Sequence, residues 1–243
     1  MVISRMQLVK ELEPGLNALF GLEYDRYENQ TAEIFDSESS DRAFEEEVML
    51  GGFANAAVKP EGQGVTYDDA QETYTARYTN ETIALAFALT EEAVEDNLYD
   101  KISTRYTKAL ARSMANTKQV KGSNVLNNST TGGSTAGGDG VALLSAAHPT
   151  LSGNQTNLLG TAADLNETSL EAALIEISQM KDERGLKIAL RGMKMILPVN
   201  LQFVAERLLN SAGRVGTADN DINAIRSLGM VPEGYVINNF LVD

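Results

Sequence analysis

The sequence predicts an α+β fold: an exposed two-stranded ribbon and one very long helix, followed by a mixed α/β region. In residues 73–79, Tyr and Ala side chains alternate with Thr and Arg, which is the two-residue period of a half-exposed strand. Residues 91–118 repeat large apolar side chains every four residues, which is the spacing of one helix face. From residue 168 onward helical and strand patterns are mixed, which indicates an α/β region.

The composition is that of a globular chain. It has 243 residues, 43% of them hydrophobic and 22% charged, which suffices for one large domain or two modest ones. The lack of cysteine excludes disulfides, thiolate catalysis and Cys-ligated metals. The longest apolar run, residues 83–89, is too short to span a bilayer, and residues 1–5 lack the features of a secretory signal. We therefore expect no membrane partner.

The acidic charge is concentrated near the N-terminus. Residues 1–20 predict a short helix that Pro14 interrupts, so this segment resembles an arm. Residues 23–47 hold ten acids against two arginines, and the whole chain has a net charge of −14. We interpret this run as a solvated, partly disordered arm. A surface of this sign repels phosphate, and no cationic track for DNA is visible.

The ribbon is predicted to continue into a core. Residues 48–60 are small and apolar, and residues 61–64 carry a Gly-rich turn signal. After the strand at 73–79, residues 83–89 are apolar on both faces, so we expect a buried continuation of the strand.

The long helix has the strongest signal in the chain. Thr90 is a suitable N-cap, and a helix over 91–118 would be about 40 Å long. We expect one side of it to face the α/β core, namely Val94, Leu98, Ile102, Tyr106, Leu110 and Met114.

Shorter elements follow a Gly-rich loop at 122–140. The sequence predicts a helix with a capping box at 168–171, and a strand at 187–197 with a bulge at Gly192. Pro198 opens another helix, and a final strand lies near 235–242.

His148 is the single histidine and the one candidate for catalysis. Ser145 lies close to it in the sequence, but no Gly-x-Ser-x-Gly elbow is present, so a Ser-His-Asp triad has weak support. The alternative is a loop histidine bonded to backbone.

Two further motifs fail on inspection. The glycine stretch at 133–138 lacks the Lys and the preceding strand of a P-loop. Residues 219–230 resemble the start of a calcium loop but lack its glycine and its bidentate Glu. The sequence therefore predicts no catalytic, cofactor-binding or metal-binding residues and no cofactor.

The order of these elements resembles the major capsid proteins of tailed bacteriophages, which have the Hong Kong 97-type shell fold that encapsulins share. The resemblance covers nearly the whole chain from about residue 20. It is most specific at residues 67–72, 77–79, 90–97, 109–114, 182–187, 216–224 and 232–235.

The resemblance implies four regions: an N-terminal arm (1–47), an extended β-hairpin E-loop (48–82), a peripheral-domain core with the spine helix (83–121) and an axial domain (122–243). Family members add C-terminal peripheral strands, which we expect to be absent from this chain. Either a missing segment or a partner would supply them. A ribbon at 60–80 cannot bury itself, so we expect it to lie on a neighbouring subunit.

The implied function is that of a non-enzymatic subunit of a phage head. Its partners are copies of itself, as hexamers and pentamers of an icosahedral shell around double-stranded DNA, with scaffold, portal or decoration proteins as further partners. Assembly would take place in the host cytoplasm, and the mature location is the virion. The main alternative is an encapsulin-like compartment, and a distant one is a hydrolase that uses His148.

Overall fold

A computed structural model describes residues 16–88, 99–132, 136–214 and 221–242. The chain divides into two compact units, which are described separately. Unit 1 comprises Met1–Ser37 and Glu81–Ser123, and unit 2 comprises Glu38–Asn80 and Asn124–Asp243.

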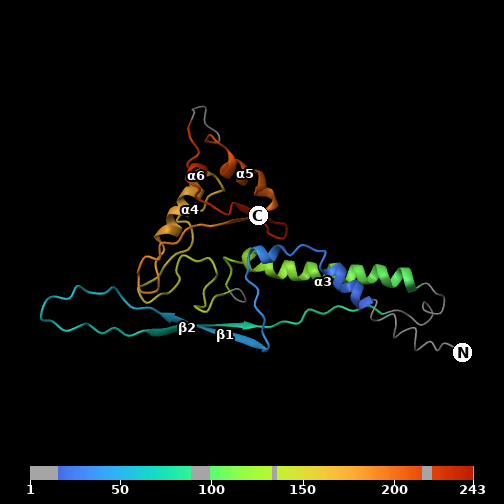
Figure 1. Ribbon diagram of the computed structural model, residues 1–243, viewed down its shortest axis with the longest axis horizontal. Helices are drawn as coiled ribbons and strands as arrows, with labels where there is room; N and C mark the ends of the chain where they lie inside the picture. The colour runs from blue at the N-terminus through green and yellow to red at the C-terminus, as the bar shows by residue number, and fades with distance from the viewer. Residues whose placement is uncertain (1–15, 89–98, 133–135, 215–220, 243) are drawn as a thin grey trace. The chain divides into compact units, whose positions relative to one another are not determined.

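Unit 1 is built on the long helix α3, Tyr99–Asn127 (Figure 1). Its 29 residues give a length of about 43 Å. The predicted start of this helix lies outside the described residues, as do Val94 and Leu98. Its end is nine residues later than predicted, so the expected loop does not begin at residue 122, where the helix continues.

The predicted apolar row of α3 is wrong for Tyr106, whose side chain is 54% exposed. The buried row lies one residue further along and recurs every four residues: Ser103, Thr107, Ala111, Ala115, Gln119 and Ser123. These side chains are small or polar, so hydrophobic periodicity alone did not mark them. They allow another segment of unit 1 to approach the helix closely.

That segment includes the first part of the acidic run, where the expectation of a solvated, partly disordered arm is wrong. Residues 16–24 are helical, and a 3-10 turn, η1, spans Gln30–Glu33. Glu23 and Thr31 are buried. The expected strand at 83–89 is also wrong for residues 83–88, which have no regular structure and leave Leu85 54% exposed.

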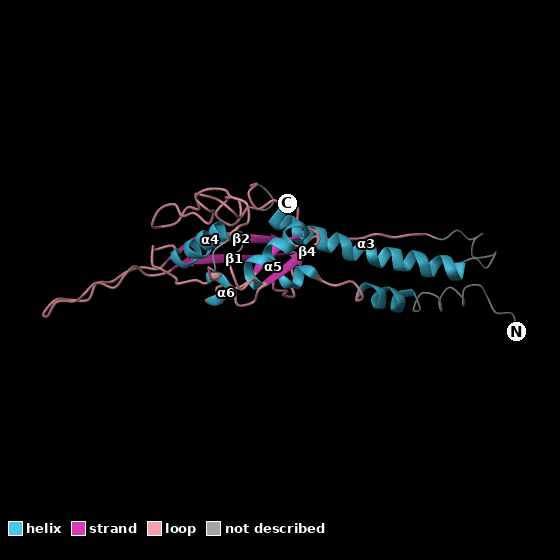
Figure 2. Cartoon of the chain, turned by 90° about the horizontal axis from the view of Figure 1, so that it is seen from above, coloured by secondary structure: helices cyan, strands magenta, loops and turns pink. Residues whose placement is uncertain are grey.

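Unit 2 contains an antiparallel hairpin of β1, Phe44–Gly51, and β2, Gln71–Thr79 (Figures 1 and 2). The predicted strand at 73–79 is confirmed, and its partner includes three acids of the predicted arm, residues 45–47. The register runs from Phe44 opposite Thr79 to Gly51 opposite Gln71. Between the strands, residues 52–70 form a long loop without strand structure, with a turn at 61–62.

The helices of unit 2 enclose its apolar core. They are α4, Glu167–Gln179; the 3-10 turn η2, Val199–Leu201; α5, Gln202–Asn210; and α6, Ala224–Ser227. The core cluster consists of Leu170, Leu174, Leu208, Leu209 and Ile225. The predicted helix after Pro198 is therefore confirmed. The capping box of α4 is formed by Asn166 and Ser169, two residues earlier than predicted.

A short parallel sheet completes unit 2. It pairs β3, Met195–Pro198, with β4, Tyr235–Asn238. The predicted strand at 187–197 is thus reduced to its last residues, and Gly192 is not a bulge. A Cβ at Gly192 would lie 2.7 Å from the Leu174 side chain, so glycine is needed there for close packing against α4.

Candidate assembly site beside the β1–β2 hairpin

The 52–70 loop cannot form a core of its own. Val58 is 94% exposed and Tyr67 is 95% exposed, so these two side chains contact almost nothing in this chain. Two bare strand ends with an extended loop are marginally stable in water unless another surface covers them. The hairpin that carries this loop is, in contrast, held firmly by unit 2.

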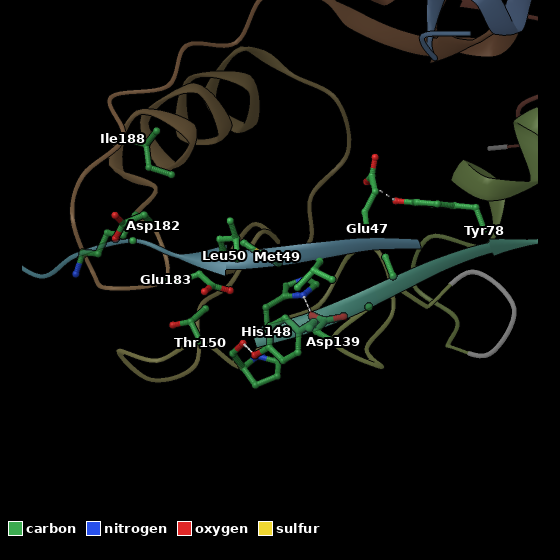
Figure 3. Close-up of a pocket in the computed structure, with 17 residues that line it drawn as sticks. Glu47, Met49, Leu50, Tyr78, Asp139, His148, Thr150, Asp182, Glu183 and Ile188 are labelled. Carbon is green, nitrogen blue, oxygen red and sulfur yellow. Dashed lines mark hydrogen bonds and ion pairs between the residues drawn. The ribbon is translucent and has the colours of Figure 1, made fainter. Parts of the chain in front are cut away.

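A cavity of about 640 Å³ lies along one face of the hairpin (Figure 3). Its walls come from β1, from β2 and from two loops of unit 2, residues 138–150 and 181–188. The sequence predicts no site here, because these segments are far apart in the chain and none of them has a catalytic motif.

The first loop packs directly against β2. A Cβ added at Gly138 would lie 3.1 Å from the backbone nitrogen of Ala76, which is closer than most such contacts, so glycine favours this approach. Near the end of the same loop, the carbonyl of Pro149 accepts a hydrogen bond from the hydroxyl of Tyr74. Burial raises the pKa of Tyr74, and the charges of Glu183 and Asp139 raise it further, so the phenol stays protonated and donates.

His148 lies in this loop and is paired with Asp139 (Figure 3). The distance from Nδ1 to the carboxylate is 2.7 Å. Burial raises the pKa of Asp139, but hydrogen bonds from His148 and the Val141 N–H lower it more, and the net direction is downward. The backbone of His148 also forms a bridge with Gln155, through bonds of 2.8 and 2.9 Å. The alternative of a loop histidine bonded to backbone therefore describes its main chain, whereas the ring is bonded to a carboxylate.

The serine of a triad is not in place. The Ser145 hydroxyl accepts a hydrogen bond from the Ala147 N–H at 3.2 Å, which is a local turn contact. His148 Nε2 is buried, and among the described residues it has no hydrogen-bond partner. Since a nucleophile must bond to this nitrogen, the arrangement supports a structural role for the His–Asp pair.

The second loop supplies a buried acid. Glu183 is 6% exposed, and its carboxylate accepts a hydrogen bond from the Thr73 hydroxyl on β2 at 3.1 Å. Its neighbour Asp182 caps its own turn, with Oδ1 accepting from the N–H groups of Arg184 and Leu186. Both acids fall in the stretch at 182–187 that carries the family resemblance, but no sequence pattern predicts that Glu183 bonds to β2.

These contacts fix the hairpin against the two loops of unit 2. The described residues contain no group of three His, Asp or Glu side chains that could hold a metal ion. No described helix is both long enough and apolar enough to cross a membrane.

Comparison with known proteins identifies the family. A family model described as phage capsid protein matches residues 72–242, which include nearly all of β2, the whole of α3 and the part of unit 2 that follows it, but not β1 or the 52–70 loop. The chain therefore belongs to the phage capsid protein family, and it is a structural component of the virion shell. No curated protein matches the sequence at a significant level.

Solved capsid structures share the fold. A chain of the bacteriophage JBD30 procapsid is 14% identical, with a TM-score of 0.65 over 98% of this chain and 100% of that one. A chain of the JBD30 capsid decorated with minor capsid protein trimers is 13% identical, with a TM-score of 0.60 over 84% and 87%. At this identity the similarity defines the fold, which is a mixed α+β capsid fold.

Proposed function

We propose that the chain is a major capsid subunit that self-assembles, as hexamers and pentamers, into an icosahedral phage head around double-stranded DNA. The observation that carries this proposal is the exposed apolar surface. Among the described residues, large apolar side chains that are exposed outnumber those that are buried. A monomer with this surface leaves apolar side chains exposed to water, which is unfavourable. Copies of one chain cover such surfaces in a closed assembly.

Within this proposal, residues 48–82 act as the E-loop, and its 52–70 part lies on a neighbouring subunit. The anchored hairpin supports this role, because the contacts from Tyr74 and Glu183 fix the strands and leave the loop uncovered. The other regions keep their expected roles as arm, peripheral-domain core and axial domain, except that residues 44–47 belong to the hairpin strand β1 and α3 extends past residue 121 to Asn127.

The partners follow from the same proposal. The JBD30 capsid is decorated with minor capsid protein trimers, and a decoration protein is a reasonable further partner for this shell. The net charge of −14 suits a container, because packaged DNA should not adhere to its wall. Enclosing the DNA requires no sequence-specific contact between the shell and the DNA.

The experiment shortens the loop without disturbing the hairpin. β2 contacts the body of unit 2, so the replacement is confined to residues 53–69, which a short Gly-Ser turn substitutes. We expect an unchanged circular dichroism spectrum and loss of closed particles in sedimentation. Closed particles from the shortened protein would overturn the proposed role of the loop, and wholesale unfolding would show that the loop belongs to the subunit's own core.

A further inference from the structure

The turn at residues 182–185 is rigid and fixed to unit 2. Its backbone closes with a hydrogen bond from the Gly185 N–H to the Asp182 carbonyl at 3.0 Å, and Gly185 has a φ of +85°, which favours glycine. The carbonyl of Asp182 accepts from the Gln155 side chain at 2.7 Å. The carbonyl of Glu183 accepts from the Ser152 N–H at 3.0 Å. The turn can therefore hold a side chain in one position.

Arg184 projects from this turn to the point where the hairpin ladder ends. The last pair of the ladder is Gly51 with Gln71. Just beyond it, Arg184 Nε donates to the Gly52 carbonyl at 2.9 Å, and Nη2 donates to the Asp69 carbonyl at 2.6 Å. One guanidinium thus bonds both legs of the 52–70 loop where they leave the strands.

A second contact between the two ends of the 52–70 loop lies next to the first. The Asp68 carboxylate accepts a hydrogen bond from the Ala54 N–H at 2.7 Å. This bond lowers the pKa of Asp68, against a rise from desolvation, and the charge of Arg184 lowers it further. Among the described residues, no other hydrogen bond joins the two legs before the turn that Gln63 closes onto the Pro60 carbonyl. The direction of the loop is therefore set at its start.

We propose that Arg184 is a positioning residue for assembly, which fixes the direction in which the 52–70 loop leaves the hairpin. The planar guanidinium suits this task, because two donors in a fixed fork hold two carbonyls at once, whereas a lysine ammonium is a single point. A loop fixed in this way reaches a neighbouring copy in one orientation and loses less conformational entropy on contact. The inference rests on the proposed function, since it assumes that the loop contacts another copy.

The loop direction can be measured on the unassembled subunit. The chain has no cysteine, so a double variant with Gln63→Cys and Gln179→Cys carries two spin labels, one at the loop turn and one on α4. Double electron–electron resonance then gives the distribution of loop positions. With Arg184→Ala we expect this distribution to broaden about twofold, because the freed legs populate more backbone states. Arg184→Lys should also broaden it, since one ammonium cannot replace the fork.

Arg191→Ala is the matched control. The Arg191 guanidinium also donates to a backbone carbonyl of unit 2, that of Gly229, but it does not touch the loop. This variant should keep the parent distribution. A parent-like distribution in Arg184→Ala or Arg184→Lys would overturn the proposal, and so would equal broadening in Arg191→Ala.

Assembly is the second readout. We expect Arg184→Ala to lower the subunit association constant about tenfold, with an unchanged circular dichroism spectrum, while Arg191→Ala assembles normally. A broadened loop with unchanged assembly would overturn the positioning role. Failure of the proposed function has a different signature, namely normal closure by the variant that lacks residues 53–69.

Discussion

The Gln119 side chain accepts a hydrogen bond from the backbone N–H of Thr31, 88 residues earlier, at 3.1 Å. Its Nε2 donates to Asn29 Oδ1 at 2.8 Å, so one amide satisfies both a backbone donor and a side-chain acceptor. Gln119 is one of the buried small or polar residues that recur every four positions along α3. Directed polar contacts therefore hold the N-terminal segment of unit 1 on α3.

Gln119→Leu tests this contact. The change leaves the Thr31 N–H buried without an acceptor, which costs about 1–3 kcal/mol of stability. We expect faster amide hydrogen exchange in residues 20–35. Asn116→Ala, at an exposed position of the same helix, is the control and should stay within about 0.5 kcal/mol of the parent. Equal exchange rates in the two variants would contradict the polar docking.

Gly122→Ala tests the closeness of the same approach. An added Cβ would lie 2.5 Å from Thr31 Cγ2 and 3.2 Å from its Cβ, and Thr31 cannot rotate freely because its hydroxyl donates to Asn29. The gain in helix propensity of up to about 1 kcal/mol should therefore be outweighed, and the N-terminal segment should be displaced.

Gly21→Ala is the matched control for this change. Gly21 also lies in a helical segment, but an added Cβ there meets nothing within 4 Å. It should be neutral or slightly stabilising in thermal unfolding. If Gly122→Ala were as stable as Gly21→Ala, the close packing of Thr31 on α3 would be wrong.

The docking of the N-terminal segment should also depend on pH through Glu23. A hydrogen bond from Lys108 lowers the pKa of this carboxyl below 4.5, against desolvation, and Arg26 lowers it further. A carboxyl with a lowered folded pKa stabilises the fold above its unfolded pKa and loses this effect as the pH falls through the folded value. The segment should therefore loosen below about pH 4.5.

Glu23→Gln makes this testable. Amide exchange in residues 20–35 should differ between parent and variant at about pH 6, and the difference should shrink towards about pH 3. Glu28→Gln, in the same acidic run but exposed, should match the parent at both values. A pH-independent difference would show that the carboxylate charge has no part in the docking.

The His148–Asp139 pair should contribute to stability and to no reaction. His148→Ala leaves a largely buried carboxylate without its ring partner, so we expect a cost of about 1–3 kcal/mol in urea unfolding. A double-mutant cycle with Asp139→Asn should give a coupling of about 0.5–3 kcal/mol. Additive effects would mean that the pair does not hold the loop at 138–150 against β2.

The sequence predicted the helices and strands of this fold better than it predicted which of their side chains are buried. Alternation in residues 73–79 and the leucine spacing of α4 identified a real strand and a real core face, because the strand pairs within this chain and the helix face is buried in its core. The predicted burial of Tyr106 and Leu85 is wrong, because periodicity identifies apolar side chains but does not show whether the same chain covers them. In a chain that forms a shell, a neighbouring copy is the natural cover for such residues.

The hairpin site could not have been predicted. Arg184 bonds carbonyls of Gly52 and Asp69, more than a hundred residues earlier, and backbone acceptors leave no trace in a sequence pattern. His148 was visible as the single histidine, but its partner Asp139 lies in a Gly-rich stretch that indicated only a loop. Both contacts depend on tertiary approach, which local spacing does not encode.

The central claim is that copies of this chain close into a shell with the 52–70 loop of each on its neighbour. Electron microscopy of particles formed by the purified chain tests it most directly. The account predicts closed icosahedral particles in which Val58 and Tyr67, exposed in the single chain, are covered by an adjacent subunit. Discrete monomers, or particles in which the loop folds back on its own subunit, would contradict it.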